Sequence, residues 1–489
     1  MKSKIGKILT SSLLAVSMIA SALPLSVSAV TTGTKSGNIN KNNIESNVKT
    51  AHNISIANEA NGWTVGGEQA SVESLKKAKV LKTDTNGNYT NSNSVSKYSD
   101  LQKQLSKAGT SNNYHYVLLN NDVSLENNIT IKDYTILLIT KDNTLDLNNH
   151  NLNLNGNNIL VTGEGSDSST IKNGQIIVNK VDAQNIAIKS LKLTNGKLTN
   201  GKTYEINQNV NKILFNESCS NVSIIGCALN NNSTDSSNSF GGRILCNASV
   251  TDLYIVNCSA AGSSPYLLRT SSSGSINNLK ITKDANSSAK LSKQITLRNS
   301  KNIKITNIDS LNYYFTKCNT ITFSNDDNKS IVNSITFDNC NNFRLRIVNV
   351  EGNLAISSCD HFSLMNVIVN GTANIKDSYF FETARATNDA CLTNIFESGL
   401  GISDCRNFIL DEAKIPIGLT IKNTTSNDYK YFSIIDSYIN NVTISNMKGF
   451  TIDKTCKKTT AKNYNLSNCS YYKNYVVRTN LTSATTHSH

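Results

Sequence analysis

The chain has 489 residues, and its 48 Lys and Arg against 35 Asp and Glu give it a formal net charge of +13. Most of the positive charge comes from Lys spread along the chain, with no cluster of basic and aromatic residues, which argues against a nucleic-acid-binding protein. After residue 29 no run approaches about 18 apolar residues, so the sequence predicts no membrane-spanning segment in the rest of the chain.

Residues 1–29 have the three parts of a secretory signal peptide. Three Lys precede an apolar stretch from Leu9 to Leu25, and Val27-Ser28-Ala29 supplies the small residues of a cleavage site. We therefore predict a secreted, extracellular protein, for which association with the cell wall is one further expectation. Loss of the three Lys would lower the net charge to +10.

Residues 30–95 are rich in Thr, Ser, Asn, Gly and Lys and repeat nothing, which predicts a polar spacer that is only partly structured. Within the spacer, 61–67 is expected to form a strand and a turn, and Ser71 to Ala78 a short helix. A C-terminal tail is predicted over 471–489, and its two His residues lack the further ligands that a metal site would need.

A short amphipathic helix is predicted just before the repeats begin. Ser99 and Gln102 have the spacing of a capping box, Leu101 and Leu105 fall on one helical face, and Gly109 follows as a stop. Such a helix would cover the open N-terminal end of a stack of strands, whose unpaired backbone would otherwise recruit other chains.

One phrase recurs with variations over residues 96–470. Each copy has an apolar-alternating run, a small or apolar residue that is often Cys, one free residue, a polar residue that is usually Asn, and a second alternating run. Clear copies are ILFNESCSNVSI at 213–224, ITFDNCNNFRL at 335–345 and LGISDCRNFIL at 400–410. The first inward apolar residues of the second runs are Ile186, Val222, Leu253, Leu279, Ile303, Ile321, Phe343, Phe362, Phe408, Phe432 and Phe450. Most neighbours in this series are about 18 to 31 residues apart, which is one supersecondary unit per repeat.

The alternation has a period of two, so the runs are predicted to be strands with one side inward. The break between them is too short for a helix, and Asn suits it because Asn tolerates the left-handed backbone region. Hairpins would favour Asn-Gly or Asp-Gly turns, which are scarce here. We therefore predict a parallel β-solenoid, in which stacked repeats share one continuous core.

These strands with Asn-containing bends resemble the right-handed parallel β-helix proteins of the pectate-lyase-like superfamily. The segment TLDLNNHNLNLNG at 144–156 resembles the opening coil of secreted bacterial members. The resemblance implies an all-β fold, a right-handed parallel β-helix with a short N-terminal capping helix. It does not by itself imply an activity, because a fold can host many functions.

The resemblance also implies where catalytic motifs would be found. Pectate lyases of the superfamily use Ca²⁺ held by carboxylates and an Arg base, but their Arg-x-Pro-x-x-Arg stretch has no counterpart here. Polygalacturonase-like members use a Gly-His-Gly element that is absent, and only Asn325-Asp326-Asp327 echoes their motifs. We therefore assign no catalytic residue and no cofactor, and Ca²⁺ is expected only if the protein is a lyase.

The cysteines follow the repeat. Five of them share the position three residues before the inward apolar residue: Cys219, Cys318, Cys340, Cys359 and Cys405. Other repeats place Ala, Val, Ile, Ser or Met at this position, so it is predicted to be interior, and the cysteines to form a stack of reduced thiols. A disulfide between neighbouring coils stays open as an alternative, because the coil spacing of about 4.8 Å is compatible with one. No Cys-x-x-Cys pair occurs, so no metal site is predicted.

The strongest candidates for a ligand site are predicted to face outward. Arg344 and Arg346 alternate with inward apolar residues, and an Arg fork suits carboxylate recognition. Lys304, two or three coils earlier, and Asp411, two or three coils later, are expected as lateral neighbours in the same region. Asp338 is expected on the outward side of the preceding strand.

A second group of candidates lies in FFETARATNDACL, a stretch that breaks the repeat pattern. Glu382, Arg385 and Asp389 are its charged residues, and insertions in solenoids commonly lie on the binding face. His361 occupies the bend position that is usually Asn, so we predict a turn residue rather than a catalytic base.

Two classes of function remain. The first is a non-catalytic, adhesin-like protein of the exterior or cell surface that binds a carbohydrate or cell-wall glycopolymer, acidic because the chain is basic. The alternative is a polysaccharide lyase or glycosidase acting on an acidic polysaccharide. The absence of a clear pair of carboxylates on one face, which hydrolysis would need, favours the first class. A self-assembling extracellular scaffold is a third, weaker hypothesis.

Overall fold

The structure is a computed structural model. Apart from the three short strands β1 (Ser55–Asn58), β2 (Gly62–Val65) and β3 (Glu68–Ala70), it describes residues 94–110, 115–156, 160–163, 168–194, 212–230, 243–262, 265–283, 287, 291–325, 331–384, 394–424, 429–435, 437–452, 460–467, 469 and 473–474. The three strands form an antiparallel sheet, and β2 lies at the strand predicted over 61–67. The predicted signal peptide at 1–29 and the helix from Ser71 to Ala78 lie outside the described residues.

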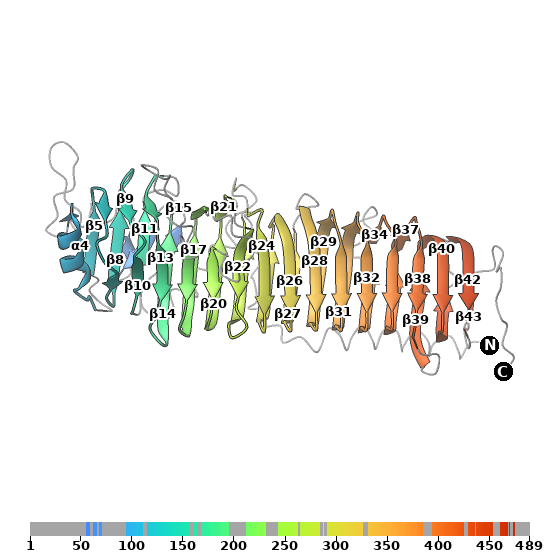
Figure 1. Cartoon of the computed structure of the whole chain (residues 1–489). Coiled ribbons are helices and arrows are strands. Elements are labelled where there is room, and N and C mark those ends of the chain that lie inside the picture. Colours follow the sequence, from blue (N-terminus) through green and yellow to red (C-terminus); the bar gives the residue numbers. More distant parts are fainter. Residues whose placement is uncertain are drawn as a thin grey trace. The chain divides into compact units, whose positions relative to one another are not determined.

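The predicted N-terminal helix is present as α4 (Tyr98–Leu105), and it follows the first short strand β4 (Ser94–Val95) instead of preceding all strands (Figure 1). Its Tyr98, Leu101 and Leu105 are buried, and it packs against β4, β5 and β7. The expected capping box is wrong, because the helix begins at Tyr98 with Lys97 at the N-cap and no side-chain cap, so Ser99 lies inside the first turn. No helix among the described residues has the length and apolarity needed to span a membrane.

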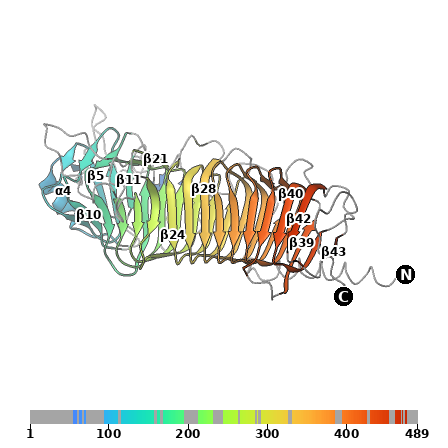
Figure 2. The ribbon, with the colours of Figure 1, turned by 45° about the vertical axis from the view of Figure 1, so that its right-hand side comes forward.

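From β4 onward, every strand pairing among the described residues is parallel, and the strands form three ladders that we call faces A, B and C (Figures 1 and 2). Face A contains β4 (Ser94–Val95), β5 (His115–Leu119), β8 (Thr135–Ile139), β11 (Leu160–Gly163), β14 (Ala183–Lys189), β17 (Cys219–Ile225), β20 (Ser249–Val256), β23 (Ser275–Thr282), β25 (Lys301–Thr306), β27 (Asn319–Ser324), β29 (Asn341–Val350), β31 (Asp360–Val369), β33 (Tyr379–Ala384), β36 (Arg406–Asp411), β39 (Tyr429–Ile435), β41 (Lys448–Ile452) and β43 (Lys473–Asn474). The pairing of β43 with β41 continues this ladder past residue 470.

Face B contains β7 (Ile129–Ile131), β10 (Asn151–Leu154), β13 (Gln175–Val178), β16 (Lys212–Phe215), β19 (Ile244–Cys246), β22 (Tyr266–Thr270), β24 (Gln294–Arg298), β26 (Ser310–Thr316), β28 (Ile331–Asp338), β30 (Leu354–Ser357), β32 (Ala373–Lys376), β35 (Leu400–Ser403), β38 (Leu419–Lys422), β40 (Tyr438–Ser445) and β42 (Thr460–Ser467). Face C contains β6 (Val123–Ser124), β9 (Thr144–Asp146), β12 (Thr170–Lys172), β15 (Lys192–Thr194), β18 (Ala228–Asn230), β21 (Ser259–Ala261), β34 (Asn394–Phe396) and β37 (Ala413–Ile415). Long strands such as β29 bend and contribute to two faces, since residues 341–346 pair in face A and 348–350 in face C. The predicted fold class, an all-β parallel β-helix with a short N-terminal helix, is confirmed.

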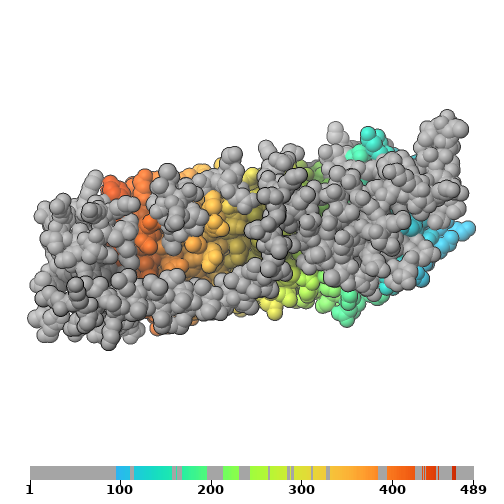
Figure 3. Space-filling view, turned by 180° about the vertical axis from the view of Figure 1, so that it is seen from behind, coloured from blue at the N-terminus to red at the C-terminus, as the bar shows by residue number. Residues whose placement is uncertain are grey.

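The register of face A confirms the repeat alignment. Ile186 pairs with Val222, and the series runs coil by coil to the pairing of Phe432 with Phe450. One coil was missing from the predicted series, because Phe381 lies between Phe362 and Phe408. In the space-filling view, the coils coloured yellow to orange follow one another as adjacent bands (Figure 3).

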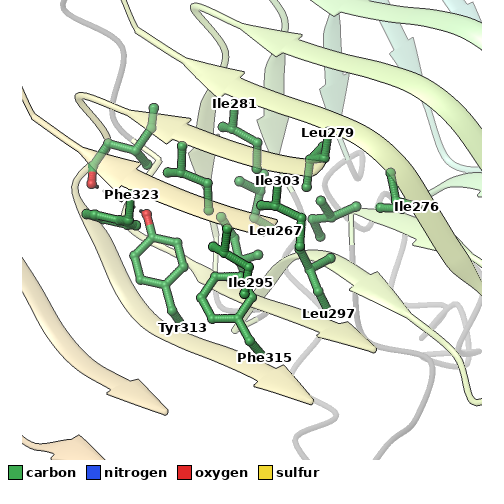
Figure 4. Packing of buried hydrophobic residues seen from close by; sticks show 14 of the residues in the cluster. Leu267, Ile276, Leu279, Ile281, Ile295, Leu297, Ile303, Tyr313, Phe315 and Phe323 are labelled. Atoms are coloured by element: carbon green, nitrogen blue, oxygen red, sulfur yellow. Dashed lines mark hydrogen bonds between the residues drawn. The ribbon is translucent and has the colours of Figure 1, made fainter. Parts of the chain in front are cut away.

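The inward residues of the three faces form one hydrophobic core. Figure 4 shows Ile281 and Ile303 of face A opposite Ile295 and Phe315 of face B. In later coils the core contains a column of phenylalanine rings at Phe343, Phe362, Phe381, Phe408, Phe432 and Phe450. Successive rings are nearly parallel, with centroids 4.6–4.9 Å apart. The predicted interior stack is therefore confirmed, and its spacing is that of the strands.

From the coil of β24 and β25 to that of β35 and β36, each bend between faces B and A has two residues in the left-handed region, whereas the earlier bends at Asn221, Asp252 and Asn278 have one. In the coil of β29, Asn339 and Asn342 both have φ of 52°, and they flank Cys340 and Asn341. The Asn339 N–H donates to Ser357 O of the next coil at 2.9 Å, so the bend keeps the inter-coil ladder intact. The bend is thus longer than the two-residue break expected from the sequence, and its repeated Asn residues fit both left-handed positions.

All nine cysteines that the structure describes are free and buried. At the bends the thiols also form hydrogen bonds with backbone carbonyls. For example, Cys340 Sγ donates to Asp338 O and lies 3.4 Å from Phe315 O of the preceding coil. Ser378 takes the same place in its coil, where its hydroxyl donates to Lys376 O at 2.7 Å. This buried position also accepts apolar side chains such as Val250 and Ile276, and where Cys or Ser stands there the side chain gains a hydrogen bond to a backbone carbonyl as well.

We expect at least nine of the eleven cysteines to titrate as free thiols when the unreduced protein is denatured. The native protein should react with few of them, because burial removes access and raises the pKa of Cys219 to about 12 and that of Cys246 well above its usual value. A thiol reagent count before and after denaturation measures both quantities. Ten cysteines found in disulfides would contradict the buried thiol stack.

Candidate ligand-binding face

The outward side of face A changes from buried to exposed along the chain. Outward residues of early coils are covered, and Tyr254 and Val256 in β20 are only 3% and 2% exposed. From β25 onward long polar side chains reach solvent, and Lys304, Arg344 and Arg346 are all exposed. The later coils of face A are therefore the part of this face that a ligand can reach.

Strand register gathers three basic residues into one outward column of face A. Lys280 pairs with Lys304, Lys304 with Thr322, and Thr322 with Arg344. We call Lys280, Lys304 and Arg344 the basic column. Lys304 and Arg344 are two coils apart, as the sequence predicted, which is about 9.6 Å between their backbones.

Glu382 continues the same column two coils beyond Arg344, with Ser363 between them. It is partly buried, and burial raises the pKa of its carboxyl above the usual value, while the positive charge of Arg344 acts in the opposite direction. Arg344 and Glu382, which belonged to separate groups of candidates in the sequence, are thus close enough for the charge of Arg344 to act on the Glu382 carboxyl. Glu382 lies in the regular strand β33, so the expectation that it sits in an insertion is wrong.

Arg385 and Asp389, the other two candidates of that stretch, lie outside the described residues. Arg346 occupies the neighbouring outward column and pairs with Met365. Asp411 belongs to the same column three coils later, about 14 Å away along the backbone, and its backbone exchanges hydrogen bonds with the Thr383 hydroxyl at 2.8 and 2.9 Å. The structure therefore does not bring Arg346 and Asp411 together.

Asp338 lies apart from the basic column. It ends strand β28 on face B, pairs in register with Ser357 and accepts a hydrogen bond from the Ser357 hydroxyl at 2.9 Å. The bend through Asn339 and Asn342 separates it from Arg344 on face A. Asp338 therefore stabilises the neighbouring coil rather than joining the Arg residues.

His361 is a bend residue, as predicted, with φ of 51°. Its ring stacks on that of Phe380, one coil later in the same bend column, with centroids 4.9 Å apart and planes 22° from parallel. Tyr379 meets Phe380 edge to face, and the Arg406 guanidinium lies over the Tyr379 ring at 5.1 Å. These aromatic residues were not among the candidates predicted from the sequence, although the run Tyr379-Phe380-Phe381 indicates them.

Among the described residues, no group of three or more His, Cys, Asp or Glu side chains is placed to hold a metal ion. No family model and no curated protein matches this sequence. The described face therefore carries a row of three basic side chains in register, two of them exposed, with the partly buried carboxyl of Glu382 at its end.

Proposed function

We propose that this protein is a secreted or cell-surface β-helix that binds an acidic carbohydrate or cell-wall glycopolymer without converting it. The observation that carries this proposal is the basic column, three cations held in register on face A, of which Lys304 and Arg344 are exposed and Lys280 is half-buried. A rigid row of charges suits a polymer that repeats its negative charges along an extended chain, because each new contact requires little further ordering of the protein.

The architecture and the N-terminus support the rest of the proposal. Three-faced parallel coils with Asn at left-handed bends are the features in which the chain resembles the pectate-lyase-like superfamily, and we propose membership on that ground. The signal-peptide pattern of residues 1–29 supports export from a bacterial cell. Membership would leave the activity open, because function depends on the site.

One observation favours an enzyme as the second candidate. Burial raises the pKa of Glu382, which lies two coils from Arg344 in the same column. A carboxyl with a raised pKa is suited to transfer a proton. A lyase or glycosidase would still need a second group or a cation, and no metal-binding cluster occurs among the described residues. Release of unsaturated uronate from an acidic polysaccharide, with Ca²⁺ added, would show lyase activity, and its loss in Glu382→Gln would place the chemistry there.

The binding proposal predicts that the variant Arg344→Ala with Arg346→Ala binds a polyuronate about tenfold more weakly than the native chain. Each exposed charge contact contributes roughly 0.5–1 kcal/mol, and about 1.4 kcal/mol corresponds to tenfold in affinity. Calorimetric titration at two salt concentrations measures the effect, and the native affinity should fall as salt rises. Replacement of both residues by Lys should lose part of the affinity, because Lys lacks the planar fork.

The matched control removes two exposed cations from face B, Lys376→Ala with Lys422→Ala. These residues occupy one face B column two coils apart, so the control changes the net charge equally. It should bind like the native chain. Equal weakening in both double variants would show that only net charge matters and would remove the basic column as a site.

A further inference from the structure

We propose that the two stacked rings of His361 and Phe380 form an aromatic platform on which a pyranose ring of the bound acidic glycan stacks. The inference rests on the proposed function and assigns it a second subsite, at the bend between faces B and A. There the polymer would make an apolar contact that the basic column of face A does not supply.

The first argument is the backbone of Phe380. It has φ of 52°, in the left-handed region, where a bulky side chain is a true outlier and Asn is favoured. Three equivalent positions are occupied by Asn302, Asn342 and Asn407, with φ of 52–56°, and two others by Thr320 and by His361, which stacks on Phe380. Phe380 gains no compensating burial, since it is 45% exposed. Because the strained backbone of Phe380 is not offset by burial of its ring, the ring is better explained by binding than by stability.

The second argument is the shape of the stack. His361 lies against one face of Phe380, and its Nδ1 lies 2.5 Å from Asp360 Oδ1. The next residue in the bend column is Asn407, so the described stack of rings ends at Phe380. The Asn407 side chain is smaller than a ring, so part of Phe380 stays exposed beside it, and a pyranose ring that packs on this exposed part would extend the stack.

The third argument is the charged residues beside the His361 and Phe380 rings, which indicate the kind of ligand that would bind there. Arg406 lies over Tyr379, and Asp360 adjoins His361, so the exposed rings are flanked by a cation and a carboxylate within one or two coils. An apolar protein surface or lipid would cover this cation and this carboxylate without offering them polar partners of its own. A uronate pyranose matches them, because its axial C–H groups meet the negative face of an aromatic ring, and its edge carries hydroxyls and a carboxylate.

The test uses Phe380→Asn, which installs the common residue of the bend and should not destabilise the fold. We expect it to weaken binding of oligogalacturonate about fivefold while the melting temperature stays equal or rises. His361→Asn should weaken binding in the same direction. The loss should be insensitive to salt, since stacking is not an ionic contact, whereas the loss in the Arg344 and Arg346 double variant should shrink at high salt.

The matched control is Thr320→Asn, which makes the same kind of change at φ of 55° in the same column but removes no ring. It should bind like the native chain. If Phe380→Asn binds oligogalacturonate like the native chain while the double Arg variant is weakened, the platform is overturned and the proposed function stands. If the native chain binds no acidic oligosaccharide, both are overturned. Self-association of the native chain that Phe380→Asn abolishes would identify a protein contact and overturn the sugar subsite.

Discussion

Phe362→Ala is expected to destabilise the coils around it by about 3–5 kcal/mol. The ring lies between those of Phe343 and Phe381, at centroid distances of 4.6 and 4.7 Å, and is 4% exposed. Its removal leaves a cavity that the flanking rings cannot fill, because each is fixed by its own strand. Dispersion contacts on both ring faces are lost together.

The damage should remain local, because each coil contacts only its neighbours. Amide hydrogen exchange should therefore accelerate in β29, β31 and β33, and remain unchanged in early coils such as that of β14. Phe380→Asn serves as the control, since it alters an adjacent ring that is outside the core. Uniform acceleration along the whole chain would contradict the nearest-neighbour picture, and no acceleration would contradict the interior stack.

Arg243→Met is expected to be the most damaging substitution of a charged residue among those described. The side chain is 2% exposed, and its guanidinium donates to Leu229 O and Tyr266 O at 2.7 Å and to Ala261 O at 2.5 Å. These carbonyls belong to strands at the point where the first ladder of face C ends. The guanidinium thus acts as donor to three carbonyls at once, and one of them, Ala261 O, lies in β21, the last strand of that ladder.

The substitution removes three donors and leaves buried acceptors unpaired, each of which costs about 1–3 kcal/mol. Part of the loss is offset because burial of the cation is itself unfavourable, and it lowers the pKa of Arg243 to about 10. We expect a net loss of about 2–4 kcal/mol in the surrounding coils. Arg243→Lys should retain part of the stability, since it keeps one donor group.

Urea unfolding followed by exchange protection of β18, β21 and β22 measures this effect. Arg298→Met is a suitable comparison, because Arg298 is exposed at the end of β24 and its loss should change stability little. A native-like stability of Arg243→Met would show that water can replace the guanidinium at these carbonyls.

The sequence by itself determined the repeating unit. Alternation within a strand and the identity of bend residues are local properties, so Phe343, Phe362, Phe408 and Phe432 could be aligned before any coil was placed. The outward direction of Arg344 and Arg346 followed from the same alternation. His361 could be recognised as a bend residue because it stands where other copies have Asn.

The sequence placed Lys304 in the region of Arg344, but only the tertiary structure decided the neighbours of the later outward residues. Loops between coils vary in length, and the coil of Phe381 was missed because Phe380 replaces the expected Asn. Without that coil, Glu382 could not be placed in the column of Arg344. The burial of Tyr254 on the outward side of face A and of Arg243 beneath face C likewise depends on what packs over them. The repeat pattern determines whether a side chain points inward or outward. Contacts between coils and with covering segments determine its neighbours and its burial.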